Sequence, residues 1–296
     1  MQVNMKTSRR DIAPRALRVP GCGHDLAVWD YPGCAPPIVF CHCAGVCGRV
    51  WDPVVARLGI ENRILAWDAC GHGDSDKPRD PQAYNTRAFA EDLLAVADAL
   101  ELSGGLLAVG HSGGAAAVAC AEMLRPGRFK RAVLIDAIIA PPEFFAGAKD
   151  LAAVSRRRKR VFPSRAAARE RLGGKPPMNA WAPEALDAYL AHALTGRSDG
   201  SAELKCPPEI EAWIYEHGPS VNLYDRLYAL QTQVLAITGT TSYMHGYVLE
   251  QCKRLPRATL RVLPDAGHFI PQEKPAQTAV LINDWFSVKN IDGAGA

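Results

Sequence analysis

The sequence of 296 residues contains no run close to the roughly 20 consecutive apolar residues that a membrane-spanning helix needs. Its net charge is only +3, because 34 Lys and Arg oppose 31 Asp and Glu. This excess is too small to make nucleic acid or an anionic membrane a default partner. Residues 1–17 lack the apolar centre of a secretory signal, and no repeat of solenoid length recurs. We therefore expect a cytoplasmic protein without a membrane span.

The composition is that of an ordinary globular protein. Hydrophobic residues make up 48% and charged residues 22% of the chain, which excludes a wholly disordered protein. The 9 cysteines are scattered, and a chain of this length needs no disulfides, so we expect reduced thiols. His42 lies among Cys41, Cys43 and Cys47, but this spacing lacks the paired ligands of a zinc site. The sequence predicts no metal and no cofactor.

Short aliphatic runs alternate with amphipathic helical patterns along most of the chain. The runs are mostly apolar throughout, which is typical of strands buried on both faces of a parallel sheet. We expect strands at 24–30, 38–40, 63–68, 106–109, 132–136, 234–238 and 259–263, and helices at 87–102, 114–124 and 276–286. Between about 141 and 228 the alternation of strand and helix patterns is interrupted, and no strand pattern occurs. This segment is expected to be a helical insertion in an α/β sheet.

Residues 106–114 hold the most informative motif. A buried run is followed by Gly110, Ser112 and Gly114 in G-x-S-x-G spacing and then by a helix of small residues. A nucleophile on a sharp strand-to-helix turn needs small residues two positions away on each side. The turn would expose the Ser112 hydroxyl and aim the Gly113 N–H at a developing oxyanion. The motif therefore indicates a serine nucleophile.

Three further segments accompany this turn in a familiar order. They are the loop at 39–45 (VFCHCAG), the loop at 67–78 (WDACGHGDSDKP) and the histidine loop at 265–275 (DAGHFIPQEKP). With the serine turn, they resemble the α/β-hydrolase superfamily over residues 24–288, the insertion excepted. The resemblance implies a mostly parallel, doubly wound sheet with a helical cap inserted after strand 6. The core would be residues 1–140 and 229–296, and the cap residues 141–228.

The resemblance also suggests the residues that activate the serine. His268 is the expected base, because its loop follows the last strand and reaches the sheet edge where Ser112 would stand. In most relatives an aspartate follows the seventh strand, but here the turn at 239–242 has no carboxylate. The family's second solution places the acid after the sixth strand, where Asp136 stands, and Glu143 is the alternative. Ser242, in the late turn, would replace the hydrogen bonds of the missing acid.

The oxyanion loop and the cap should shape the substrate pocket. The second oxyanion N–H is expected from Ala44 or, as runner-up, from Cys43, which occupies the family's usual glycine position. An apolar pocket should lie beneath the cap. Its candidate residues are His42, Phe144, Phe145, Trp181, Trp213 and Tyr215. The aromatic residues of the insertion could equally form the cap's own core.

The cap also holds a basic run at 156–160 that continues to Arg165, Arg169 and Arg171. A solvated helix face is one interpretation of this run. An arginine that reaches inward to bind a substrate carboxylate is the other. Because no aromatic residues are interleaved with the run, it is a weak nucleic-acid signal.

Together these residues predict a serine hydrolase that cleaves a carboxylic ester through an acyl-enzyme on Ser112. We expect a small-molecule substrate with an apolar or aromatic part, and the sequence leaves a homodimer open. The same residues would also serve hydrolysis of a C–C bond, a lactone or an amide. The alternative of another class is a non-catalytic ligand-binding protein on the same scaffold, since the late acid and the oxyanion-loop glycine are both missing.

Overall fold

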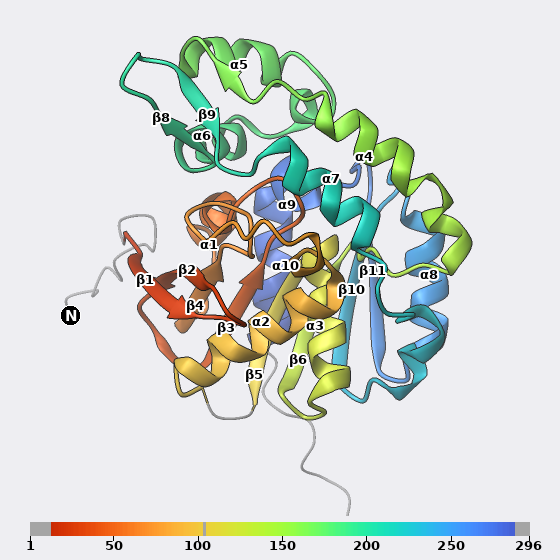
Figure 1. Ribbon diagram of the computed structural model, residues 1–296. Helices are drawn as coiled ribbons and strands as arrows, with labels where there is room; N and C mark the ends of the chain where they lie inside the picture. The colour runs from red at the N-terminus through yellow and green to blue at the C-terminus, as the bar shows by residue number, and fades with distance from the viewer. Residues whose placement is uncertain (1–12, 103–104, 288–296) are drawn as a thin grey trace, which may run out of the picture.

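The computed structural model describes residues 13–102 and 105–287, and it has a central sheet with helices on both faces (Figure 1). The 8 strands follow the order β1-β2-β4-β3-β5-β6-β10-β11. Strand β2 pairs antiparallel with β1 and β4, and the other neighbours are parallel. The strands are β1 (Arg15–Pro20), β2 (Asp25–Tyr31), β3 (Cys34–Cys41), β4 (Asn62–Trp67), β5 (Leu106–His111), β6 (Phe129–Ile135), β10 (Gln233–Gly239) and β11 (Ala258–Leu263). The predicted α/β fold with a mostly parallel sheet is confirmed.

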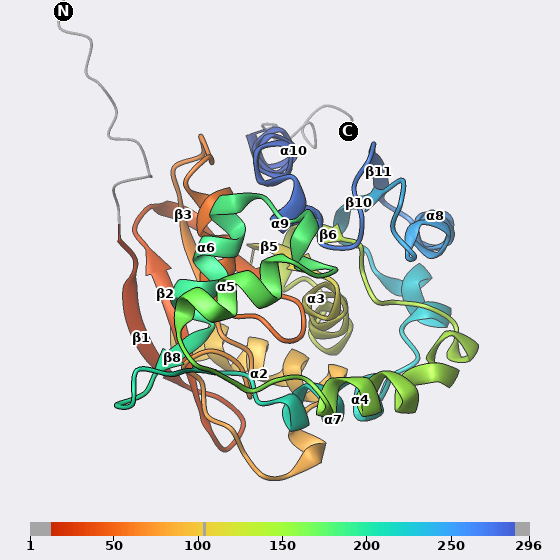
Figure 2. The same ribbon diagram turned by 90° about the horizontal axis from the view of Figure 1, so that it is seen from above.

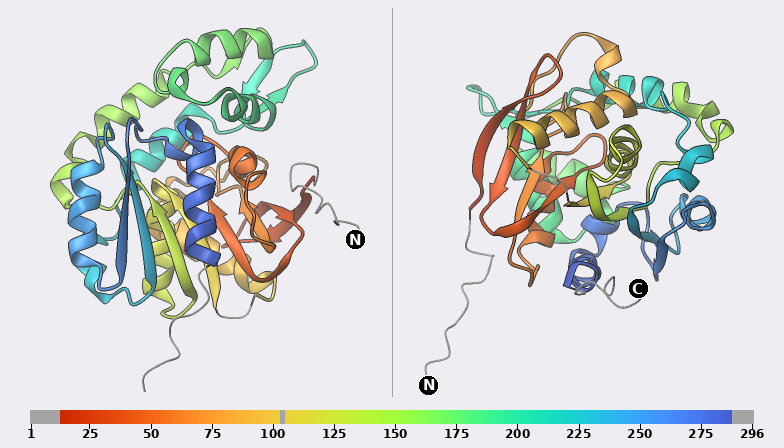
Figure 3. Two further views of the ribbon diagram at one scale, coloured as in Figure 1. Left: turned by 180° about the vertical axis from the view of Figure 1, so that it is seen from behind. Right: turned by 90° about the horizontal axis from the view of Figure 1, so that it is seen from below.

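Side chains of the central strands alternate between two hydrophobic clusters, one on each face of the sheet. In β5, Leu106 and Ala108 belong to one cluster, while Leu107 and Val109 belong to the other. The first face is covered by α2, α3 and α8, and the opposite face by α1 and α10 (Figures 1 and 3). The helices of this part are α1 (Asp52–Val55), α2 (Thr86–Ala99), α3 (Gly113–Leu124), α8 (His245–Arg254), α9 (Ile270–Glu273) and α10 (Pro275–Ser287). Burial on both faces explains why these strands are apolar throughout.

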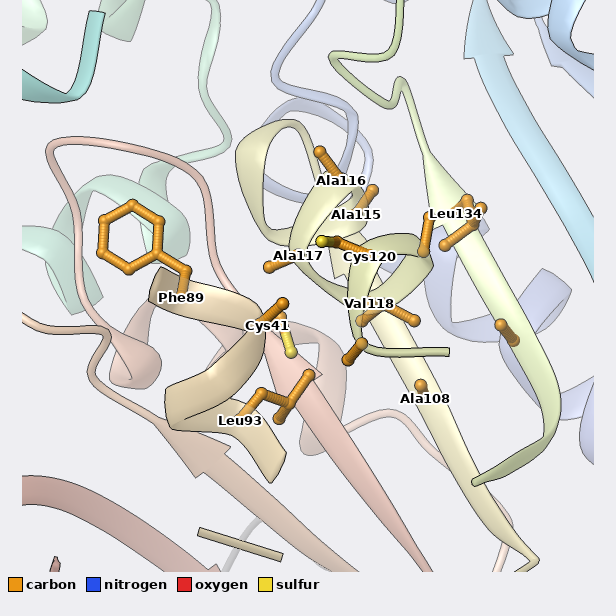
Figure 4. Close-up of a cluster of buried hydrophobic side chains, with 14 of the residues drawn as sticks. Cys41, Phe89, Leu93, Ala108, Ala115, Ala116, Ala117, Val118, Cys120 and Leu134 are labelled. Atoms are coloured by element: carbon orange, nitrogen blue, oxygen red, sulfur yellow. The ribbon is translucent and has the colours of Figure 1, made fainter. Parts of the chain in front are cut away.

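Helix α3 lies close to its neighbours because its side chains are small. Ala115, Ala116, Ala117 and Val118 point to different sides of the helix, and all four are buried in the same cluster (Figure 4). A Cβ atom on Gly114 would lie 2.5 Å from the carbonyl oxygens of the loop that follows β3. The glycine therefore allows the first turn of α3 to touch that loop.

The segment between β6 and β10 lies across the end of the sheet at which β5 and β6 end (Figures 1 and 2). Its helices are α4 (Ala148–Arg156), α5 (Arg165–Gly173), α6 (Pro183–His192) and α7 (Pro208–His217). It also holds a three-stranded antiparallel sheet of β7 (Val161–Phe162), β9 (Ala202–Leu204) and β8 (Leu194–Gly196), which the sequence pattern does not predict. Such short strands are invisible to apolar periodicity. The division into a core and a cap domain at 141–228 stays a prediction, and its core residues 1–12 and 288–296 lie outside the described residues.

Arginines of the basic run form ion pairs with carboxylates of the cap itself. Arg156 bonds to Glu209 and Glu216 of α7. Arg158 bonds to Glu211, which is buried on the same helix. Arg156 is exposed, as the solvated-face interpretation expects, while it also pairs with α7. Arg158 points inward, but its partner is Glu211 of the chain itself.

Strand β1 is absent from the predicted strands because it is an edge strand with little apolar surface. Only Val19 of its six residues is buried. All 9 cysteines are free thiols in the structure. Across residues 13–102 and 105–287, no helix combines the length and the apolar content that crossing a bilayer requires.

Candidate active site

Ser112 stands on a strained turn between β5 and α3. Its backbone has φ 58° and ψ −121°, a conformation that a non-glycine residue adopts only when its surroundings enforce it. Here the Ser112 N–H donates to the Ile135 carbonyl at 2.9 Å, which fixes the turn against β6. A Cβ atom on Gly110 would lie 2.5 Å from the Cα atom of Ala115, so the turn needs glycine at that position. This geometry lifts the serine hydroxyl to the end of the sheet.

His268 follows β11 and lies beside the serine. Its Nε2 atom is 2.9 Å from Ser112 Oγ. The ring of His111 lies behind it, and His111 Nε2–H donates to the His268 carbonyl at 2.8 Å. Burial and the neighbouring His268 hold the pKa of His111 well below its usual value of 6.5. His111 is therefore neutral and positions the His268 backbone without adding a positive charge.

Asp136 lies on the other side of the imidazole, just after β6. Its Oδ2 atom is 2.6 Å from His268 Nδ1, and its side chain is fully buried. Thr238 donates a hydrogen bond to the other carboxylate oxygen at 2.7 Å, and Ser242 donates to Oδ2. The alternative acid, Glu143, is exposed in the 3-10 turn Pro142–Gly147. The structure thus brings Ser112, His268 and Asp136 together and places Ser242 on the same carboxylate.

The residues expected to donate to an oxyanion, Gly113 and Ala44, come from two segments that meet at the cavity of Ser112. Within the described ranges, the N–H groups of Gly113 and Ala44 donate to no protein acceptor. Both residues line the same cavity as Ser112, as does Cys43. Two N–H groups that converge beside a serine hydroxyl can stabilise a negative oxygen.

Two buried histidines hold the oxyanion loop in place. His42 accepts from the Ala69 N–H at 3.0 Å and donates through Nδ1 to the Cys43 carbonyl at 2.7 Å. His72 accepts from the Gly45 N–H at 3.0 Å. Burial lowers the pKa of both rings, so both are neutral. His42, expected in the pocket, therefore lies behind the loop, because its nitrogens are bonded to backbone.

A cavity of about 500 Å³ opens from Ser112 toward the cap. Of the aromatic residues expected there, Phe144, Phe145 and Tyr215 line it. Trp181 and Trp213 do not. Trp181 is buried in the cluster that the cap shares with the loop after β3, and Trp213 stacks on Tyr84 with ring centroids 5.6 Å apart. These two side chains fill the cap and its seam with the core rather than the cavity.

Several lining residues are absent from the sequence-based set. Tyr243 lies beside the His268 imidazole, with its ring centroid 4.7 Å from that of His268. Phe269 and Phe89 also line the cavity. Tyr243 directly follows Ser242 in the turn after β10, so its place at the sheet edge was a usable signal. No Asp, Glu, Lys or Arg side chain lines this cavity within the part of the chain that is described.

Residues 38–281 match the alpha/beta hydrolase family. The chain belongs to this family. The fungal abhydrolase domain-containing protein AKT2 of Alternaria alternata is 24% identical over 218 residues, which are 61% of this chain and 82% of that protein. Membership of the hydrolase family rests on the match over residues 38–281 and not on this relative.

Solved structures of the same fold include several hydrolases. E-2-(acetamidomethylene)succinate hydrolase has a TM-score of 0.81 and 22% identity, covering 93% of this chain and 99% of that one. A thermophilic esterase from Thermogutta terrifontis, solved with malate bound, has a TM-score of 0.71 and 22% identity, covering 92% and 98%. At these identities the likeness concerns the fold.

Proposed function

We propose that this protein is a serine hydrolase that cleaves a carboxylic ester through an acyl-enzyme on Ser112. The proposal rests on two consecutive hydrogen bonds. His268 Nε2 lies 2.9 Å from Ser112 Oγ, and His268 Nδ1 lies 2.6 Å from Asp136 Oδ2. A serine hydroxyl is a weak nucleophile until a base takes its proton. A buried carboxylate on the far nitrogen holds the base in the required tautomer.

In the first half of the proposed reaction, Ser112 Oγ attacks the ester carbonyl while its proton moves to His268 Nε2. Asp136 stabilises the imidazolium, and the N–H groups of Gly113 and Ala44 stabilise the tetrahedral oxyanion. The intermediate then collapses, the C–O bond breaks, and His268 returns the proton to the leaving alcohol. The acyl group remains on the serine.

In the second half, water enters where the alcohol stood. His268 takes a proton from this water, and the hydroxide oxygen attacks the acyl carbonyl. Collapse of the second intermediate breaks the bond to Ser112 Oγ, which recovers its proton from His268. The products are one carboxylic acid and one alcohol, and the enzyme is restored.

The cavity supports a neutral, apolar acyl or alcohol group as the substrate's main part. Its volume of about 500 Å³ lies within the usual range for small-molecule sites. A dicarboxylate such as the succinate derivative in the first neighbour's name would need positive partners, and the described lining holds no Lys or Arg. The proposal is therefore an ester with uncharged aliphatic or aromatic groups.

A panel of p-nitrophenyl esters of graded chain length tests this proposal. We expect turnover of uncharged acyl chains, weak turnover of a succinyl half-ester, and a loss of roughly 10³-fold or more in kcat/KM for Ser112→Ala. Ser201→Ala, in the turn between β8 and β9, is the matched control and should keep full activity. Amide, lactone, thioester and β-diketone substrates form further arms. If kcat/KM for one of these substrates exceeds that for every ester, the proposed ester specificity is wrong, while the proposed roles of Ser112, His268 and Asp136 remain.

A further inference from the structure

A second group of reactive side chains lies where three segments meet, apart from the catalytic site. His24 comes from the turn between β1 and β2, Cys70 from the loop after β4, and Asp92 from the middle of α2. One nitrogen, one sulfur and one carboxylate oxygen of these residues all lie within 4.8 Å of one another. His24 Nε2 is 2.9 Å from Asp92 Oδ2, and Asp92 is fully buried.

A fourth potential ligand lies beside this group. The Cys22 N–H donates to Asp92 Oδ1 at 2.9 Å, and partial burial together with this carboxylate raises the pKa of the Cys22 thiol. Cys22 is exposed, so the group is reachable from solvent. The His24 imidazole, the Cys70 thiol and the Asp92 carboxylate thus surround a single point, and Cys22 lies next to this group without belonging to it.

We propose that His24, Cys70 and Asp92 form a binding site for a divalent cation of the Zn²⁺ type, with the neighbouring Cys22 thiol turning inward as the fourth ligand. Zinc takes thiolate sulfur, imidazole nitrogen and carboxylate oxygen in tetrahedral sites, at about 2.0–2.3 Å from each ligand. Four ligands at such distances lie roughly 3.3–3.8 Å apart. Among His24, Cys70 and Asp92 the present separations, 2.9 Å and up to 4.8 Å, require shifts of about an ångström or less to reach that arrangement, whereas Cys22 has to turn its side chain toward the group.

The other group of cysteines and histidine, in the oxyanion loop, differs in one decisive respect. Both nitrogens of His42 are bonded to backbone groups, so that ring has none to offer a metal. The partner of His24 Nε2 is instead a carboxylate, itself a metal ligand. A cation can replace the proton that this nitrogen and oxygen share without breaking a backbone hydrogen bond of His24 or Asp92, although Cys70 gives up its long thiol contact of 3.9 Å to the Asp76 carbonyl.

The bound cation would fasten the turn at 21–24 and the loop after β4 to α2. That loop also carries His72, which holds the oxyanion loop through Gly45. None of the four ligands lines the substrate cavity. The role is therefore structural, and the site does not depend on the proposed hydrolase function.

Cobalt binding under reducing, oxygen-free conditions tests the site, because Co²⁺ replaces Zn²⁺ and absorbs light when thiolates bind it. Tag-free protein should bind one equivalent of Co²⁺ with a thiolate charge-transfer band and the visible bands of tetrahedral cobalt. Zn²⁺ should displace it and raise the Tm. Cys70→Ser and His24→Gln should each lose the bands, whereas Cys252→Ser and Ser112→Ala should keep them.

Three outcomes would overturn the site. The first is a wild-type protein that shows no absorption bands in excess Co²⁺. In that case His24 and Asp92 form only a hydrogen-bonded pair. The second is bands that persist in both Cys70→Ser and His24→Gln. The third is bands that Cys43→Ser removes instead. Circular dichroism of each variant separates loss of binding from loss of fold, and the wild-type result needs no variant.

Discussion

The carboxyl ends of β6 and β10 lie side by side, yet they contribute differently to the site. After β6 comes Asp136, whose carboxylate contacts the His268 imidazole. After β10 comes the turn at 239–242, where most relatives would carry the acid, and it supplies the Ser242 hydroxyl instead. The two strands are parallel neighbours, with Ile135 beside Ile237.

This difference shows that the carboxylate partner of His268 is defined by its position at the sheet edge and not by the strand that it follows. Two adjacent strand ends point at the same edge of the sheet, so a carboxylate from either can reach one imidazole. The turn after β10 has no acid, yet His268 still has a carboxylate partner in Asp136. The hydroxyl at 242 keeps the hydrogen bond that orients the early acid.

The largest expected loss of activity comes from replacing the carboxylate that follows β6. Asp136→Asn should lower kcat/KM by roughly 10⁴-fold, because the amide holds the imidazole in the wrong tautomer and cannot stabilise the imidazolium. Ester hydrolysis with matched protein concentrations measures this. Glu143→Gln is the control and should keep wild-type rates, and the reverse pattern would assign the acid to Glu143.

Moving the acid to the β10 side should restore part of the loss. In the double variant Asp136→Asn with Ser242→Asp, we expect kcat/KM to recover by about tenfold or more over Asp136→Asn alone. The Ser242 oxygen already lies one hydrogen bond from the carboxylate that contacts His268. The single variant Ser242→Asp is the control. No recovery in a folded double variant would contradict the equivalence of the two strand ends.

A smaller loss is expected when the β10 turn gives up its hydroxyl. Ser242→Ala removes one hydrogen bond to a charged group, worth about 1.5–3 kcal/mol, so kcat/KM should fall by roughly 10- to 100-fold. Thr241→Ala changes the neighbouring hydroxyl, which bonds to the Ala266 carbonyl instead, and it should have a weaker effect. Equal losses in the two variants would show that Ser242 acts only through the turn's stability.

The smallest expected effect concerns the end of β5, where His111 supports His268. The folded-state pKa of His111 lies below its unfolded value of about 6.5, so below that pH the unfolded chain takes up a proton that the folded chain does not. Stability is therefore lost as pH falls from about 6.5, by up to about 1.4 kcal/mol per pH unit. His111→Asn lacks this proton uptake, so its unfolding free energy should fall less between pH 7 and pH 5. Identical pH slopes would be evidence against a buried neutral His111.

The parts of this molecule that local sequence dictates were predictable. Gly110 and Gly114 stand where a Cβ would strike backbone, so the turn around Ser112 needs them. The central strands are buried on both faces and therefore have continuous apolar sequences. Asp136 was expected from the resemblance to the family, which has a second place for the acid after the sixth strand, and in the structure it contacts His268.

The remaining features depend on contacts between distant segments. Arg156 and Arg158 are near neighbours in sequence, but their carboxylates lie more than fifty residues away on α7. Trp181 and Tyr215 are both aromatic residues of the cap, yet only Tyr215 faces the cavity. Sequence pattern cannot tell which way such side chains point, because the cap shares its core with the loop after β3. The short strands of the cap carry no periodic signal at all.

Labelling with a fluorophosphonate tests the central claim most directly, since this probe reacts with a serine only when a base has activated it. Mass spectrometry of the native protein should find one adduct on Ser112, formed much more slowly in Asp136→Asn and absent in Ser112→Ala. Folded wild-type protein that stays unlabelled at Ser112 would contradict the account. It would favour a ligand-binding protein on a hydrolase scaffold.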